Sequence, residues 1–206
     1  MTATQTDAPC AEDSQPDPRE ALARTQAWVA GLLAGVTRDQ LALPTPCADF
    51  DVALLAGHLY GVAERVEAMG DGRPAASVPA FVDALPDDLA LGYRQRAERS
   101  QAAWADDATL SRVVVAPFGP LPGAEVLGVY VSEQLTHGWD LAVATGQHAE
   151  AAPDLVALGE RAIRAALEPL PRGGPVPFGP AVEPAPGAGP TERLAAYLGR
   201  SWPRGR

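Results

Sequence analysis

The chain contains no lysine, because all 16 of its basic residues are arginine, and they are outnumbered by 26 acidic residues. The formal net charge is -10 at pH 7. A nucleic-acid partner requires a cationic footprint that neutralises phosphates, and this balance argues against such a partner. An anionic membrane surface is disfavoured for the same reason. We therefore expect neither nucleic acid nor a membrane as a partner.

Cysteine is also scarce. Cys10 and Cys47 are the only two, they lie far apart, and neither belongs to a CxxC pair. This excludes a disulfide scaffold and a cysteine-based structural zinc site, and it leaves the role of Cys47 open. No apolar run approaches the ~18 residues of a membrane helix. The first residues lack the basic and apolar regions of a signal peptide. These absences predict a cytoplasmic protein.

The composition that remains is typical of a globular chain. Hydrophobic residues make up 47% and charged residues 20% of 206 residues, enough for one domain with a sizeable core. Residues 1–16 are polar and acidic, which predicts a disordered tail. Residues 17–168 are predicted to form a helical bundle. Residues 169–206 are predicted to form a Pro/Gly-rich wrap followed by a short C-terminal helix.

Helix start and stop signals define the bundle. Asp17 and Pro18 predict the start of the first helix, and Gly146 predicts the end of the fourth. A β-branched run within residues 111–116 predicts one short strand or an extended segment. Four long helices with small additions predict an all-α four-helix bundle. Asp49 or Asp51 is the predicted cap of the second helix, and Pro86 marks either the start of the third or a break within it. The expected helices span about residues 18 to 31 or 35, 49 or 51 to 69, a third region ending near 104, 122 to 146, 153 to 167 and 191 to 198.

The fourth predicted helix carries ionisable residues on an apolar stripe. At 100° per residue, seven positions share one face. A buried carboxylate is costly unless it meets a charge or a metal, so Glu133 and His137 should find a partner inside the bundle. The positions on this face are Val126, Tyr130, Glu133, His137, Asp140, Leu141 and Ala144.

The second helix offers such a partner. His58 shares helical spacing with Leu54, Leu55 and Val62, so it is expected to point inward. Packed helices lie ~8–10 Å apart, which lets His58 share one ion with the fourth helix. Two histidines and one carboxylate with an open position form the ligand set of a catalytic zinc or non-haem iron site. We predict a divalent metal, zinc in the first instance, on His58, Glu133 and His137.

Ordinary structural roles remain alternatives for each residue. Glu133 and His137 at i, i+4 can be a simple helix pair, and His58 can be a satisfied core histidine. Asp140 either orients the His137 ring or serves in a helix cap or a salt bridge with an arginine. His148 lies in a polar loop and is left out of the ligand set.

Several separated segments resemble the mycothiol-dependent maleylpyruvate isomerase N-terminal, DinB-like family. Residues 45–52 (TPCADFDV) lead into residues 55–59 (LAGHL), as at the start of the family's second helix. Residues 133–142 (EQLTHGWDLA), followed by Thr145-Gly146-Gln147, resemble its HGWDLA motif. Residues 117–123 (PFGPLPG) and 194–200 (LAAYLGR) are similar to its short single-domain actinobacterial branch. The resemblance covers roughly residues 20–200.

The resemblance implies a DinB-like four-helix bundle with a zinc-type ion on the same three residues. It also implies mycothiol, or a related low-molecular-weight thiol, as the cosubstrate at the open metal position. Zinc holds such a sulfur as the nucleophilic thiolate at neutral pH. The implied activity is that of a mycothiol-dependent S-transferase or isomerase-like enzyme. The isomerases carry a distinct C-terminal domain, whereas here only the Pro/Gly-rich stretch and a short helix are expected after the bundle, so the electrophilic substrate stays open.

Two other functions remain alternatives. One is a non-catalytic metal- or thiol-binding protein, which a closed coordination sphere would favour. The other is a metal-assisted hydrolase, which a general base such as Asp140 beside the open position would favour. An open cleft with polar and arginine side chains would favour the thiol enzyme. The expected partners are a small-molecule thiol and an electrophile, and the oligomeric state, monomer or homodimer, is left undecided.

Overall fold

The computed structural model describes residues 16–117, 119–168, 172 and 178–203. Nearly all of the predicted disordered tail, residues 1–16, lies outside this range. Residues 169–171 and 173–177, at the start of the predicted Pro/Gly-rich wrap, also lie outside it. Within the described residues, helices dominate, and the structure confirms the predicted all-α, DinB-like class of fold.

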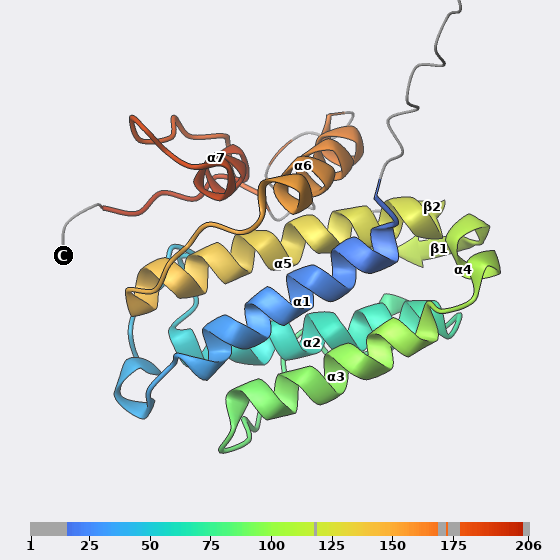
Figure 1. Ribbon diagram of the computed structural model, residues 1–206, viewed down its shortest axis with the longest axis horizontal. Coiled ribbons are helices and arrows are strands. Elements are labelled where there is room, and N and C mark those ends of the chain that lie inside the picture. The colour runs from blue at the N-terminus through green and yellow to red at the C-terminus, as the bar shows by residue number, and fades with distance from the viewer. Residues whose placement is uncertain (1–15, 118, 169–171, 173–177, 204–206) are drawn as a thin grey trace, which may run out of the picture.

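Four long helices form the body of the molecule (Figure 1). Helix α1 contacts α3 and α5, and α2 contacts the same two helices, so the four close into a ring in the order α1, α3, α2, α5. This arrangement sets α2 directly beside α5. Their bounds are α1 Pro18–Ala34, α2 Val52–Gly70, α3 Leu89–Ala103 and α5 Gly123–Thr145.

Aspartate caps fix where three of these helices begin. The side chains of Asp17, Asp51 and Asp88 each accept a backbone N–H at 2.8 Å, satisfying a donor that the first turn leaves unpaired. Asp51 was one of two predicted caps, whereas the third helix begins after Asp88 and not at Pro86. Gly146 ends α5 in the left-handed conformation with φ 72°, as predicted.

Short elements connect the long helices. Strands β1 (Val113–Ala116) and β2 (Gly119–Pro122) pair antiparallel, next to the one-turn helix α4 (Asp107–Ser111). The sequence predicted only the first strand, because the second contains two prolines and no β-branched residue. The 3₁₀ turns η1 (Arg38–Gln40) and η2 (Ala75–Ser77) complete the connections.

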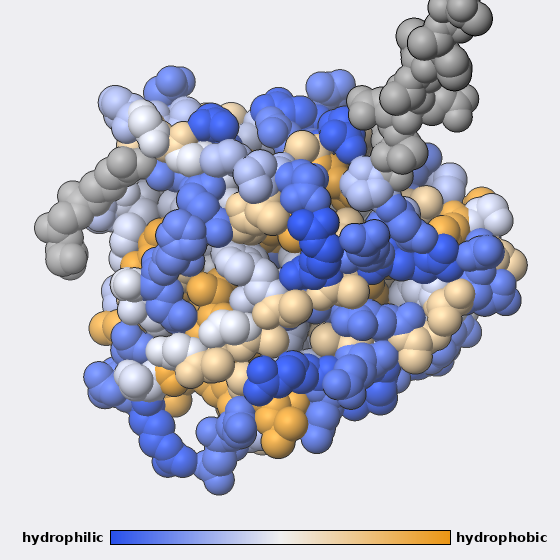
Figure 2. All heavy atoms as spheres, viewed as in Figure 1, coloured by the Kyte–Doolittle hydropathy of each residue, from blue (hydrophilic) through white to orange (hydrophobic). Residues whose placement is uncertain are grey.

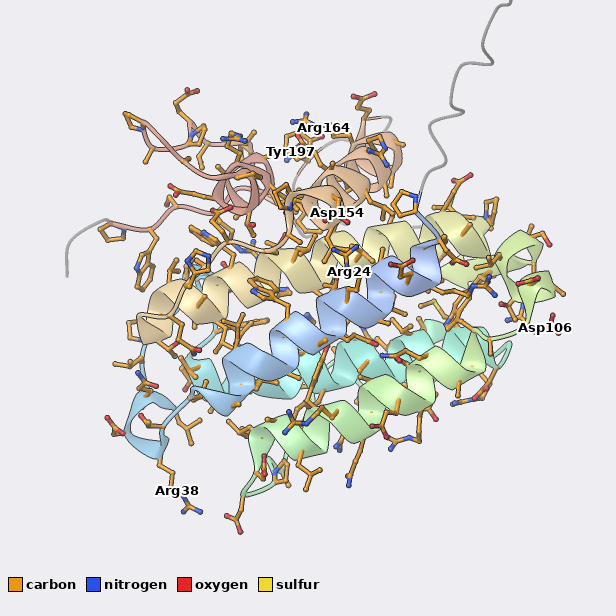
Figure 3. The ribbon with its side chains drawn as sticks, in the orientation of Figure 1. Arg24, Arg38, Asp106, Asp154, Arg164 and Tyr197 are labelled. Atoms are coloured by element: carbon orange, nitrogen blue, oxygen red, sulfur yellow. The ribbon has the colours of Figure 1, made fainter. Side chains whose placement is uncertain are left out.

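Two further helices cover α5. Helices α6 (Pro153–Leu167) and α7 (Pro190–Tyr197) both pack on α5 and on each other (Figure 1). Arg24 of α1 points toward Asp154 of α6, with 2.6 Å between Nη1 and Oδ2, and the guanidinium of Arg164 lies 3.8 Å from the ring centre of Tyr197 (Figure 3). The exposed ion pair adds little stability, so apolar burial is what holds α6 and α7 on the bundle.

The surface and core follow the sequence pattern. Figure 2 shows hydrophilic residues over most of one face, with smaller apolar patches between them. Within the described residues, no helix combines the length and apolarity that crossing a bilayer requires. In the core, the buried Tyr93 hydroxyl of α3 donates to Gln134 Oε1 of α5 at 2.6 Å. This bond satisfies both polar groups away from water.

Replacing Tyr93 by phenylalanine tests that core bond. The substitution leaves the Gln134 oxygen buried without its donor, so we expect the free energy of unfolding to fall by about 1–3 kcal/mol. Urea unfolding followed by circular dichroism measures the loss. Tyr197→Phe is the control, because the described contacts of the Tyr197 side chain are those of its ring with two arginines. Equal stability of both variants would show that the bond contributes nothing.

Candidate metal centre

The three predicted ligands converge between α2 and α5. Nε2 of His58 lies 3.3 Å from Oε1 of Glu133, and Nε2 of His137 lies 3.5 Å from the same oxygen. Each residue offers one ligand atom, and these three atoms all lie within 4.8 Å of one another. Helical spacing of four residues puts Glu133 and His137 on adjacent turns, and the packing of α2 on α5 brings His58 to them.

Both imidazole rings turn their Nδ1 atoms away from the centre. His58 Nδ1 lies 3.0 Å from the carbonyl oxygen of Ala80, which can only accept, so Nδ1 must carry the proton. His137 Nδ1 lies 3.1 Å from Oδ2 of Asp140. Metal-binding histidines usually donate their outer N–H to a carbonyl or carboxylate in this way. The two Nε2 atoms are left facing Glu133.

The spacing of the donor atoms fits a bound cation. In a neutral ring, Nε2 presents a lone pair to the Glu133 carboxylate, and two acceptors repel unless a proton or metal ion lies between them. Tetrahedral zinc with bonds of ~2.0–2.1 Å places neighbouring ligand atoms about 3.3 Å apart. The measured 3.3 and 3.5 Å agree with that spacing. The donor set suits zinc and leaves a position for another ligand.

The electrostatics of the centre favour positive charge. Burial disfavours the Glu133 carboxylate, but hydrogen bonds to His137 and His58 outweigh burial and hold its pKa well below the usual value. Burial likewise opposes a charged His137, yet hydrogen bonds to Asp140 and Glu133 raise its pKa to about 9. Without a metal, the His137 ring therefore carries a second proton and a positive charge near neutral pH. A divalent cation would compete for the same negative potential.

A loop laid against α2 orients His58. The amide of Val82 donates to the carbonyl of Gly57 at 3.1 Å, and one turn further along the helix, Gly61 lies against the carbonyl of Ala80. Any side chain at Gly61 would overlap that carbonyl oxygen, so glycine is what permits the close approach. The loop can therefore bring the Ala80 oxygen to Nδ1 of His58.

Two phenylalanines line the centre. The ring centre of Phe81 lies 5.2 Å, and that of Phe50 5.5 Å, from the ring centre of His58. The Glu133 side chain is nevertheless 24% exposed and that of His58 12% exposed, so solvent reaches the ligands. The sequence pattern gave no indication of a role for these two rings. Phe50 lies inside the TPCADFDV segment, but Phe81 stands in a loop without a recognisable pattern.

A second group of potential ligands shares His137. Ligand atoms of Cys47, His137 and Asp140 also lie within 4.8 Å of one another. The Arg200 guanidinium occupies this group, with Nε 3.1 Å from Oδ2 of Asp140 and Nη2 3.5 Å from Sγ of Cys47. Burial raises the pKa of the Cys47 thiol to about 11. A fixed cation and a protonated thiol both disfavour a metal here, so we interpret the group as an ion-pair network.

The other residues considered in the sequence lie outside the centre. Asp140 makes both contacts that were weighed for it, one with the ring of His137 and one with an arginine. His148 is exposed. Leu54 was expected to point inward with His58 but is 40% exposed, whereas Leu55 and Val62 are buried. The prediction that Leu54 belongs to the inward face of α2 was therefore wrong.

Comparison with known proteins places this chain in a family. The sequence profile of the mycothiol maleylpyruvate isomerase N-terminal domain matches residues 22–142, more than half of the chain and all three candidate ligands. The chain belongs to this family. In this member of the family, His58 comes from the second long helix of the bundle, and Glu133 and His137 come from the last.

Two curated relatives extend the similarity beyond the matched domain. Both are uncharacterized proteins of Mycobacterium tuberculosis, one from strain CDC 1551 / Oshkosh and one from strain ATCC 25618 / H37Rv. Each is 38% identical to this chain over 186 residues, which is 90% of this chain and 98% of the relative. No solved structure gives a significant match.

Proposed function

We propose that this protein is a metal-dependent, mycothiol-dependent S-transferase or isomerase-like enzyme that activates a low-molecular-weight thiol for attack on a small electrophile. One observation carries the proposal. The imidazoles of His58 and His137 each contact an acceptor through Nδ1 and direct Nε2 at the same oxygen of Glu133, 3.3 and 3.5 Å away. His58, Glu133 and His137 would hold a divalent ion, with zinc the expected one. Membership of the family links the chain to mycothiol.

Each side chain has a defined task in this proposal. When bound, zinc supplies a Lewis acid that keeps a cosubstrate sulfur deprotonated at neutral pH. Glu133 cancels one of the two positive charges, while the neutral rings of His58 and His137 preserve the remainder. The apolar rings of Phe50 and Phe81 reduce water around the ligands and so strengthen electrostatic attraction there.

Further observations support the thiol enzyme over the alternatives. Asp140 binds Nδ1 of His137, on the side of the ring opposite Nε2, and so suits an orienting role better than that of a hydrolytic base. The partial exposure of Glu133 and His58 would admit a small molecule, which a purely structural metal site would not need. A low-molecular-weight thiol cosubstrate also agrees with the cytoplasmic location that the sequence predicts.

Metal analysis combined with thiol-consumption assays tests the proposed function. We expect purified protein to hold about one zinc ion per chain, as a single three-residue site implies. It should consume mycothiol when a small electrophile such as an epoxide or a halodinitrobenzene is added. A chelator should abolish the consumption and added zinc restore it. Metal without thiol consumption would indicate a binding protein, and thiol-independent ester hydrolysis would indicate a hydrolase.

A further inference from the structure

An arginine from the C-terminal end of the fold reaches the candidate metal centre. Arg200 lies 60 residues beyond Asp140, yet its Nε is 3.1 Å from Oδ2 of that carboxylate. The Arg200 side chain is 12% exposed and that of Asp140 is fully buried. Because the family profile matches residues 22–142 only, this contact comes from outside the matched domain.

A turn after α7 aims Arg200 at the bundle. The amide of Gly199 donates to the carbonyl of Ala196 at 3.0 Å, and the amide of Arg200 donates to the carbonyl of Ala195 at 2.9 Å. Gly199 has φ +87°, a left-handed conformation that favours glycine. These two bonds and the glycine form a Schellman motif, which reverses the chain at the helix end.

Buried leucines and hydrogen bonds hold helix α7 on the bundle, and this packing determines the position of Arg200. Leu194 and Leu198 are fully buried against the rest of the fold. At the start of the helix, Glu150 Oε2 accepts the amide of Thr191 at 3.0 Å, and the hydroxyl of Thr191 accepts the amide of Ala151 at 3.0 Å. Docking of α7 thereby places a cation beside Asp140.

The Asp140 carboxylate is held through one oxygen. Oδ2 faces both Nδ1 of His137 and Nε of Arg200, each at 3.1 Å, whereas Oδ1 has no hydrogen-bond partner among the described residues. A buried carboxylate requires a compensating charge. If Arg200 were removed, the carboxylate would lose that charge and be free to rotate. His137 would then lose the acceptor that fixes its ring.

We propose that Arg200 is a positioning residue for the metal centre. It holds Asp140, Asp140 holds Nδ1 of His137, and Nε2 is thereby directed at the ion. The affinity of the centre for metal then depends on the docking of α7. This inference rests on the proposed metal centre for its effect on affinity, while its effect on the His137 ring can be tested without metal.

Metal competition measures the effect on affinity. In the full-length protein, Arg200→Gln should weaken Co²⁺ and Zn²⁺ binding against a chromogenic chelator about 10–100-fold, the usual effect of losing such a partner. The visible absorption bands of bound Co²⁺ should shift as well. Arg200→Lys, which keeps the charge, should recover part of the affinity. Two control variants should bind metal like the unchanged protein. Arg193→Gln changes an exposed residue of α7, and Cys47→Ala removes the other side-chain contact of Arg200.

Nuclear magnetic resonance of metal-free protein separates the two proposals. The proton on Nδ1 of His137 should exchange slowly with water in the unchanged protein and faster in Arg200→Gln, with unfolding temperature as the check on folding. If Arg200→Gln does not fold, Asp140→Asn replaces it and should show the same faster exchange. Unchanged Nδ1 exchange, or an affinity loss shared by Arg193→Gln, would overturn the role of Arg200. Absence of metal binding by the unchanged protein would instead overturn the proposed function.

Discussion

Replacing His137 by alanine is expected to reduce zinc affinity by roughly 10²–10³-fold. Structural zinc sites with four ligands release ~10–16 kcal/mol on binding, so one ligand accounts for about 2.5–4 kcal/mol. His137 is 4% exposed and directs Nε2 at the centre, so its loss removes one of the three protein ligands. Zinc competition and elemental analysis of dialysed protein measure the effect.

The control for that variant is His148→Ala. His148 is exposed and lies beyond the Gly146 cap, so its loss should leave zinc affinity unchanged. His58→Ala should reproduce the loss seen with His137→Ala, because both rings face the same Glu133 oxygen. Retention of zinc by either the His58 or the His137 variant would contradict the assigned ligand set.

Placing alanine at Gly61 should damage both the fold and the centre. The added methyl group would overlap the carbonyl of Ala80 and approach the amide of Phe81 to 3.1 Å, and neither backbone group can move cheaply. We expect the free energy of unfolding to fall by about 1–3 kcal/mol. Displacing Ala80 also removes the acceptor for Nδ1 of His58, so metal affinity should fall about 10–100-fold. Chemical unfolding and metal competition measure the two effects.

Gly31→Ala is the matched control for that substitution. Gly31 is also helical, but a methyl group there would meet nothing within 4 Å. Alanine has the higher helix propensity, so this variant should be more stable by about 0.5–1 kcal/mol, with unchanged metal affinity. If Gly61→Ala behaved in the same way, close approach of the loop could not be what orients His58.

Local signals in the sequence predicted several of the helix ends. Asp17 and Asp51 begin α1 and α2, and Gly146 ends α5, because capping depends on backbone groups only a few residues away. Periodicity also predicted that Glu133 and His137 share a face, since residues four apart are neighbours on any helix. Strand β2 was missed because two of its four residues are proline, which carries no strand signal.

The sequence by itself thus determined the class of fold and, through helical periodicity, the identity of the three residues that converge. The partners of those residues were decided only by the tertiary structure. Ala80 contributes a backbone oxygen, which no side-chain pattern can indicate, and Arg200 reaches Asp140 from 60 residues away. Both contacts depend on how a loop and a helix dock on the bundle, and docking is set by packing between distant segments.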